Sequence, residues 1–240
     1  MARSKTSKSV DRNGKLRDNV RVVARLLRKE YHDFNHNNPP NPLANLLFVI
    51  CSVQTTKINY ELAYRNLRRS FPTFLALSRA EQSEIARILA PAGLSNQKAR
   101  FIKLVLAELT RVFGKPTLAP LRHMRGEECE AFLTALPGVG KKVARCVMMS
   151  TLGRKVFPVD THCWRVCGRL GWRPSRLRAC TPAAMDFLQD TLPKSLRRSL
   201  HVNFLSLGRE FCLPQRPRCP ECPLLGVCPT GSRHKQRNPG

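Results

Sequence analysis

Apolar residues recur at every third or fourth position through most of this chain, which is the pattern of helices that bury one face. Residues 96–113 follow this pattern with Ala99, Ile102, Leu106, Leu109 and Phe113. Gly114 and Pro116 come next, and a glycine followed by a proline is a common end of a helix. Period-two alternation is absent apart from a short stretch, Lys155–Val159, that suggests extended backbone. The sequence therefore predicts a mainly α-helical fold.

The same periodicity places the other helices along the chain. We expect helices over residues 16–27, 43–53, 59–69, 79–89, 96–113, 127–136, 141–152, 160–170, 182–191 and 196–209. The Asn/Pro-rich segment His36–Pro42 is expected to be a linker. Since 42% of the residues are hydrophobic, the chain has enough apolar side chains for a folded core.

Positive charge dominates the composition, with 42 Lys and Arg against 16 Asp and Glu and a net charge of +26. Such an excess opposes compaction unless a polyanion is bound. Nucleic acid is the favoured partner, through contacts with its phosphates, and an anionic membrane surface is the alternative. No run of 18 apolar residues occurs, so we expect no membrane-spanning helix.

The N-terminal twenty residues are basic and serine-rich, and they lack the apolar segment of a secretory signal. A transit peptide is one interpretation, but Asp11 and Asp18 weigh against it. We expect instead a mobile basic arm that helps to hold DNA.

The stretch LPGVGKKV, residues 136–143, predicts a tight turn between two helices. Glycine permits positive φ and brings no Cβ near a ligand, so Gly138 and Gly140 allow close approach to the backbone. Amide groups at the start of a helix bind anions. The turn Gly138–Val139–Gly140 is therefore a candidate for binding a DNA phosphate, and an ordinary helix–helix turn is the alternative.

Lys141 and Lys142 open the helix after this turn, where the helix dipole disfavours cations. Such a placement suggests a use for the lysines, either as a phosphate contact or as a nucleophilic amine. Because adjacent residues on a helix point about 100° apart, both side chains cannot enter one pocket.

Asp160 follows the apolar residues of VFPV and precedes a predicted helix. An aspartate in that position is usually an N-cap. The same carboxylate can also stabilise a developing cation, so the two roles are compatible. His162 is a weaker candidate for a base.

The ten cysteines fall into two groups. Six lie in apolar, helix-like surroundings and are expected to be small buried side chains: Cys51, Cys129, Cys146, Cys163, Cys167 and Cys180. The others, Cys212, Cys219, Cys222 and Cys228, form a C-x6-C-x2-C-x5-C array that is suited to bind zinc or an iron–sulfur cluster. Arg216 and Arg218 lie within this array and are candidates for contacting phosphate.

LPGVGKK, PVDTH and the cysteine array, in this order, resemble the endonuclease III family of DNA glycosylases in the helix-hairpin-helix superfamily. The resemblance runs from about Asn41 to Cys228, and the cysteine spacing matches the [4Fe–4S] loop of that family. It implies an all-α fold of two helical domains with a DNA cleft between them. One would be a six-helix barrel at residues 36–154. The other would combine residues 1–35, a basic arm and helix, with residues 155–240, which hold the cluster.

The resemblance also implies roles for individual residues. Lys142 would be the Schiff-base nucleophile and Asp160 the catalytic aspartate. Gln54 would fill the gap left by an extruded base, and Leu94 would wedge into the opposite strand. The implied activity is removal of oxidised pyrimidines from double-stranded DNA, followed by β-elimination at the abasic site.

Two departures from the family pattern put the lesion preference in doubt. Lys57 stands where many relatives have an aspartate, and Ser95 replaces a common tyrosine after the wedge leucine. A glycosylase for mismatched or otherwise modified pyrimidines is therefore an alternative, as is a non-catalytic DNA-binding protein. We expect a monomer, located in the bacterial cytoplasm with the nucleoid, or in a eukaryotic nucleus or mitochondrion.

Overall fold

The computed structural model describes the backbone of residues 4–34 and 38–237, and side chains within 15–34 and 38–233. The first residues of the predicted basic arm and of the predicted linker fall at 1–3 and 35–37, outside the described residues. The chain forms two compact units. Unit 1 combines Met1–His36 with Lys155–Gly240, and unit 2 is Asn37–Arg154.

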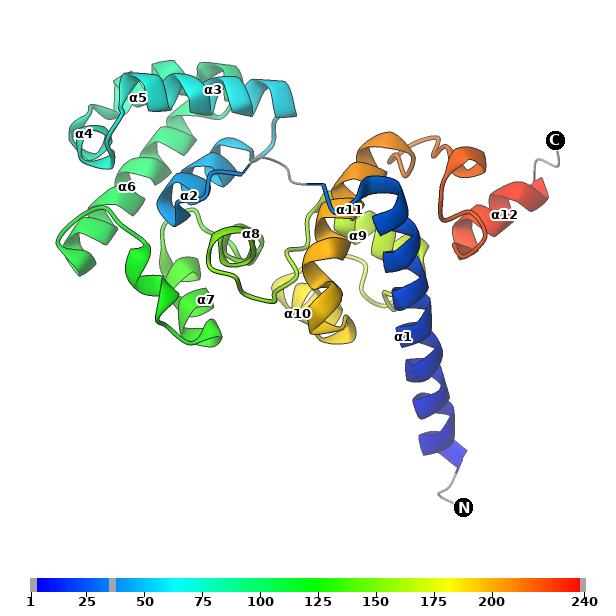
Figure 1. Ribbon diagram of the computed structural model, residues 1–240. Helices are drawn as coiled ribbons and strands as arrows, with labels where there is room; N and C mark the ends of the chain where they lie inside the picture. Colours follow the sequence, from blue (N-terminus) through cyan, green and yellow to red (C-terminus); the bar gives the residue numbers. More distant parts are fainter. Residues whose placement is uncertain (1–3, 35–37, 238–240) are drawn as a thin grey trace. The chain divides into compact units, whose positions relative to one another are not determined.

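The regular secondary structure in the described part of unit 1 consists of helices (Figure 1). Its α-helices are α1 (Ser4–Tyr31), α9 (Thr161–Arg169), α10 (Pro182–Thr191), α11 (Arg197–Glu210) and α12 (Pro229–Arg237). Two short 3-10 helices, η3 (Lys194–Leu196) and η4 (Cys219–Glu221), lie between them. Helix α11 packs against both α1 and α9.

The core of unit 1 forms around two aromatic side chains. Trp172 and Phe204 are buried, and their ring centroids lie 5.6 Å apart. The indole Nε1 of Trp172 donates to Oδ1 of Asn19 at 2.7 Å, so the polar edge of the ring is satisfied on α1. Val20, Val23 and Leu27 of α1 complete this core, as the three-to-four spacing predicts.

Helix α1 begins far earlier than the sequence pattern indicates. The apolar spacing predicts a helix from residue 16, but the helix starts at Ser4. The predicted start at residue 16 is therefore wrong, and residues 4–15 are helical. This part of the helix has almost no apolar residues that could show a period, but it also has no proline to stop a helix that packs further along.

Unit 2 consists of α2 (Pro42–Cys51), α3 (Lys57–Ser70), α4 (Phe74–Arg79), α5 (Gln82–Leu89), α6 (Ser95–Phe113), α7 (Gly126–Ala135) and α8 (Lys141–Thr151). The 3-10 helices η1 (Ala90–Ala92) and η2 (Ala119–Arg122) flank α6. Helix α6 packs on α5, α2 packs on α8, and α7 packs on α8. No strand occurs in the parts of either unit that the structure describes.

The predicted helix at 79–89 is wrong at its start. Helix α4 ends at Arg79, and α5 begins only at Gln82, with Glu81 as its N-cap. Ala80 has ψ 151°, which is extended backbone, so the two short helices are separate. Residues 78–84 hold only one apolar residue, Ala80, so the apolar pattern gave no sign of the break.

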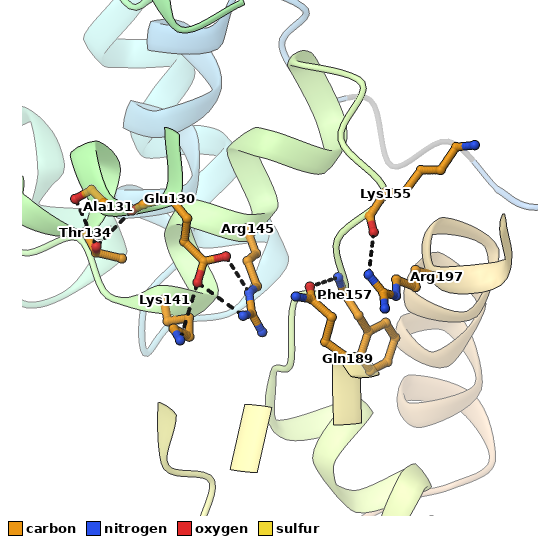
Figure 2. A network of polar contacts seen from close by, with 9 residues as sticks. All are labelled: Glu130, Ala131, Thr134, Lys141, Arg145, Lys155, Phe157, Gln189 and Arg197. Atoms are coloured by element: carbon orange, nitrogen blue, oxygen red, sulfur yellow. Dashed lines mark hydrogen bonds and ion pairs between the residues drawn. The ribbon is translucent and has the colours of Figure 1, made fainter. Parts of the chain in front are cut away.

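The segment before Asp160 is irregular rather than a strand, and side chains satisfy its backbone. The backbone N–H of Phe157 donates to Oε1 of Gln189 at 2.9 Å, and Arg197 donates to the carbonyl of Lys155 at 2.9 Å (Figure 2). The ring nitrogen Nδ1 of His201 lies 2.9 Å from the carbonyl oxygen of Pro158. Helices α10 and α11 therefore hold the segment that leads into Asp160.

None of the helices in the described part of the chain combines the length and the apolar character that crossing a membrane requires.

Asp33 joins α1 to α11. Its carboxylate accepts hydrogen bonds from Arg28 Nε at 3.0 Å, from Asn203 Nδ2 at 2.8 Å and from the hydroxyl of Ser199. Burial acts to raise the pKa of Asp33, but the hydrogen bonds from Ser199 and Asn203 and the charge of Arg28 outweigh it and hold this pKa below its ordinary value of 3.8.

Because the folded-state pKa is depressed, the ionised Asp33 stabilises the fold at neutral pH, and this contribution is lost as pH falls below about 4. We expect Asp33→Asn to lower the free energy of unfolding at pH 7 and to flatten its decline in acid, measured by urea unfolding between pH 7 and pH 3. Asp18→Asn, which changes an exposed carboxylate of α1, is the control. If the free energy of unfolding of Asp33→Asn falls in acid as steeply as that of the original protein, this role is contradicted.

Candidate active site

The turn between α7 and α8 contains the motif that the sequence singled out. Leu136 and Val139 are buried, and the backbone N–H of Val139 donates to the carbonyl of Leu136 at 3.1 Å. Val139 as a whole residue is only 4% exposed, so its side chain is not open to a ligand. Gly140 is the N-cap of α8 and supplies no side-chain cap. The backbone N–H groups in the first turn of α8 are therefore suited to bind an anion.

The two glycines of the turn have different reasons to be glycine. Gly138 has φ +74°, and a Cβ there would overlap the ring of Phe101. Gly140 has φ −82°, which other residues adopt readily, and a Cβ there would have no neighbour within 4 Å. The predicted positive φ is therefore found at Gly138 and not at Gly140. The open space at Gly140 fits the expectation that a ligand approaches the backbone.

Glu130 of α7 connects the hairpin by ion pairs, which Figure 2 shows. Its carboxylate accepts from Arg145 Nε at 2.9 Å and from Arg145 Nη2 at 3.1 Å. The Lys141 ammonium lies 3.4 Å from the same carboxylate. Arg145 is 2% exposed, so this two-point pair compensates a buried charge. Lys141, which is predicted to contact DNA, is thus ion-paired with Glu130.

Lys142 follows in the first turn of α8 and is half-buried. It lies in unit 2, whereas Asp160 lies in unit 1.

Asp160 is the N-cap of α9, as its place in the sequence predicts. Its Oδ1 accepts from the backbone N–H of Cys163 at 2.7 Å, and its φ of −100° is that of extended backbone. A cap of this kind fixes the carboxylate at the positive end of the helix dipole.

His162 is packed against α11 and is a poor candidate for a base. Nη2 of Arg165 lies 3.1 Å from Nδ1 of His162 and donates to the carbonyl of Gly208 at 2.8 Å. Burial lowers the pKa of His162, and although Asp160 acts to raise it, the charges of Arg165 and Arg209 lower it further. Because Arg165 can only donate, Nδ1 accepts this hydrogen bond, and the ring has a structural role.

Gln54 and Leu94 both lie in turns of unit 2 with left-handed backbone. Gln54 has φ 51° and Leu94 has φ 48°, conformations that are uncommon for residues other than glycine. Both side chains are exposed, and 46% of Leu94 is accessible. An exposed leucine in a strained turn suits the predicted wedge. Lys57, which departs from the family pattern, lies 3.8 Å from Glu61 at the start of α3.

The four clustered cysteines line one cavity of unit 1. The cavity encloses about 300 Å3 of space, partly open to solvent, and its other lining residues include Arg169, Phe211 and Pro217. Burial and the neighbouring thiols raise the pKa of Cys222 to about 11, although the backbone of Leu224 acts to lower it. Within the described side chains, no three His, Cys, Asp or Glu residues come close enough together to hold one metal ion.

Two arginines of α9 bind the start of the cysteine loop. Arg165 donates to the carbonyl of Cys212 at 2.7 Å, and Arg169 donates to the sulfur of Cys212 at 3.1 Å. Four cysteines, one of them receiving a hydrogen bond from a guanidinium, form a donor set that fits a thiolate-bound cofactor. The predicted phosphate contact Arg218 is paired with Glu221, whereas Arg216 is exposed and has φ 48°.

The other cysteines are mostly buried, as expected. Cys51, Cys129, Cys146, Cys163 and Cys167 are buried, but Cys180 is only half-buried.

Comparison with known proteins identifies the family. Residues 47–187 match the family described as "HhH-GPD superfamily base excision DNA repair protein". The chain belongs to this superfamily. It is 28% identical over 208 residues to endonuclease III of Thermotoga maritima, covering 86% of this chain and 92% of that protein.

A solved structure and a longer relative extend the comparison. The chain resembles a trapped endonuclease III–DNA covalent intermediate with a TM-score of 0.73 and 27% identity, over 91% of this chain and 98% of that one. It is also 30% identical over 167 residues to ROS1A of Oryza sativa, which covers 63% of this chain but only 9% of the rice protein's length.

These findings place the chain in the HhH-GPD base excision DNA repair superfamily, with an all-helical fold of two helical domains like that of endonuclease III. The sequence predicted this family and this fold class correctly. It missed Glu130, which neutralises two cations of the hairpin, and Lys98, a buried lysine of α6. Lys98 lies four residues before the buried Ile102 on the apolar stripe of α6, and this spacing was a signal for its burial.

The contrast between the two hairpin glycines gives a test. Gly138→Ala should lower the free energy of unfolding by about 2 kcal/mol, because its backbone is left-handed and its Cβ would overlap Phe101. Gly140→Ala should leave stability within about 0.5 kcal/mol of the original. Thermal unfolding of both variants checks this, and equal losses would show that the turn is described wrongly.

Proposed function

We propose that this protein is a bifunctional DNA glycosylase and abasic-site lyase that removes oxidised pyrimidines from double-stranded DNA. The observation that carries the proposal is the glycine hairpin turn followed by Lys142 in the first turn of α8, since a half-buried amine there fits a nucleophile. The trapped covalent DNA intermediate of a structural relative with 27% identity supports the same chemistry.

The first step is extrusion of the damaged nucleotide. A damaged base pairs and stacks poorly, so turning it out of the duplex costs less than for a normal base. Gln54 and Leu94 are exposed in strained turns, and they would keep the duplex open once the base has left. The backbone amides at Gly138, Val139 and Gly140 would hold a phosphate, which positions the protein without reading sequence.

The second step is attack on the sugar. Lys142 attacks C1′ of the extruded nucleotide as a neutral amine, and the bond from C1′ to the base breaks. Asp160, fixed by its cap on α9, offsets the positive charge that develops on the sugar as the base leaves. The imine that forms between lysine and sugar acidifies the neighbouring carbon, and β-elimination then cuts the strand on the 3′ side.

We propose that Cys212, Cys219, Cys222 and Cys228 hold a [4Fe–4S] cluster. The support is the shared cavity, the hydrogen bond from Arg169 to the Cys212 sulfur and a spacing typical of the family. When bound, the cluster stiffens the loop that carries Arg216 and Arg218. Arg216 would then contact a DNA phosphate. Arg218 would contact a phosphate in place of its ion-pair partner Glu221.

Covalent trapping tests the nucleophile. With borohydride and a duplex that carries one oxidised pyrimidine, we expect a stable protein–DNA complex from the original protein and none from Lys142→Ala, seen by denaturing gel electrophoresis. Reduction of the imine is what makes the complex permanent, so the signal reports the Schiff base directly.

Lys141→Ala is the matched control for this trapping experiment. Its side chain points about 100° away on the helix, so trapping should persist at saturating protein. Trapping that survives in Lys142→Ala would show that another group is the nucleophile. Trapping with a mismatched pyrimidine but not with an oxidised one would favour the alternative substrate class.

Metal analysis tests the cofactor. We expect about four iron and four sulfide ions per purified chain, and Cys222→Ser should lose them. Cys180→Ser, which changes a half-buried cysteine of the same unit outside the cavity, should keep them. One zinc ion per chain in place of iron would contradict the cluster.

A further inference from the structure

Lys98 is a buried lysine whose partners are carbonyl oxygens rather than a carboxylate. It lies in the first turns of α6 and is 3% exposed. Its Nζ donates to the carbonyl of Cys51 at 2.9 Å and to that of Ala92 at 2.8 Å. Cys51 is the last residue of α2 and Ala92 the last of η1. Carbonyls at helix ends carry partial negative charge, so one ammonium stabilises both ends.

Each of these carbonyls immediately precedes a strained turn. Gln54, with φ 51°, comes three residues after Cys51, and Leu94, with φ 48°, comes two residues after Ala92. Left-handed backbone is unfavourable for both residue types, so the surrounding structure has to hold it. The two turns are far apart in sequence, and the Lys98 ammonium is bonded to the start of both.

We propose that Lys98 is a positioning residue that holds the Gln54 turn and the Leu94 turn at a fixed separation for insertion into a DNA duplex. The inference rests on the proposed function, in which these two side chains keep the duplex open. Burial of the alkyl chain fixes the ammonium, and the ammonium fixes the two carbonyls. Both turns therefore lose their order together when the ammonium is removed.

Helix α6 offers a matched control in Lys103. Its Nζ also donates to two carbonyls, those of Ser78 and Ala80, both at 2.7 Å. These residues form the end of α4, which carries no proposed DNA contact. Lys98→Met and Lys103→Met therefore remove the same kind of interaction from the same helix, and only the first affects the two turns.

Hydrogen exchange of the free protein is the first measurement. In Lys98→Met we expect amides in residues 52–56 and 92–95 to exchange about tenfold faster, which corresponds to about 1.4 kcal/mol. In Lys103→Met these amides should exchange as in the original protein, and only the amides near Ala80 should change. Faster exchange in one turn alone, or in neither, would overturn the coupling that we propose.

Lesion discrimination is the second measurement. It is the ratio of affinities for a duplex with a tetrahydrofuran abasic-site analogue and for the same duplex undamaged. We expect Lys98→Met to lower this ratio about tenfold and to keep the affinity for undamaged duplex, because phosphate contacts dominate that affinity. Lys103→Met should keep the ratio. If both variants lower it equally, Lys98 only supports the fold and the proposal is wrong.

Three further variants keep the outcomes distinct. Should Lys98→Met fail to fold, Lys98→Gln replaces it in both measurements, since its shorter amide retains a donor. The pair Gln54→Ala and Leu94→Ala tests the proposed function itself. If these two variants keep the discrimination ratio, the assigned duplex contacts are wrong. If they lower it and Lys98→Met does not, only the role of Lys98 is wrong.

Discussion

Cations far outnumber carboxylates in this chain, 42 to 16, and both units depend on how the buried cations are satisfied. Several buried or half-buried cations bind main-chain carbonyls: Lys98, Lys103, Arg165, Arg169 and Arg197. Carbonyls at helix ends lack partners within the helix and are natural acceptors for such groups. The excess of positive charge that indicates a polyanionic partner thus also connects the helices inside each unit.

Two of the carboxylates order segments that carry site residues. Glu130 binds Lys141 and Arg145 and so joins α7 to α8 around the hairpin turn. Glu221 binds Arg218 within the cysteine loop. An acid in either place neutralises part of a surface that we propose contacts phosphate, and it also reduces repulsion among neighbouring cations. The local charge of the candidate site is therefore smaller than the composition suggests.

The sequence predicted those features that depend on nearby residues. The end of α6 at Gly114, which has φ 71°, and the N-cap at Asp160 follow from short-range rules. The sharing of one cavity by four cysteines follows from their close spacing. The early start of α1 and the break between α4 and α5 lie in stretches with few apolar residues, so the apolar pattern could not reveal them. The carbonyl partners of Lys98 at Cys51 and Ala92 could not be predicted because they depend on contacts between segments far apart in sequence.

The irregular stretch before Asp160 has a consequence for the modularity of the fold. Its backbone groups are bound by Gln189, Arg197 and His201, all of which come later in the chain. A fragment that ends before α10 would retain the residues PVDTH and the whole of α9 but none of these anchors. The position of the aspartate is thus a property of the assembled C-terminal helices, and transplanting the motif alone into another scaffold would not transplant its geometry.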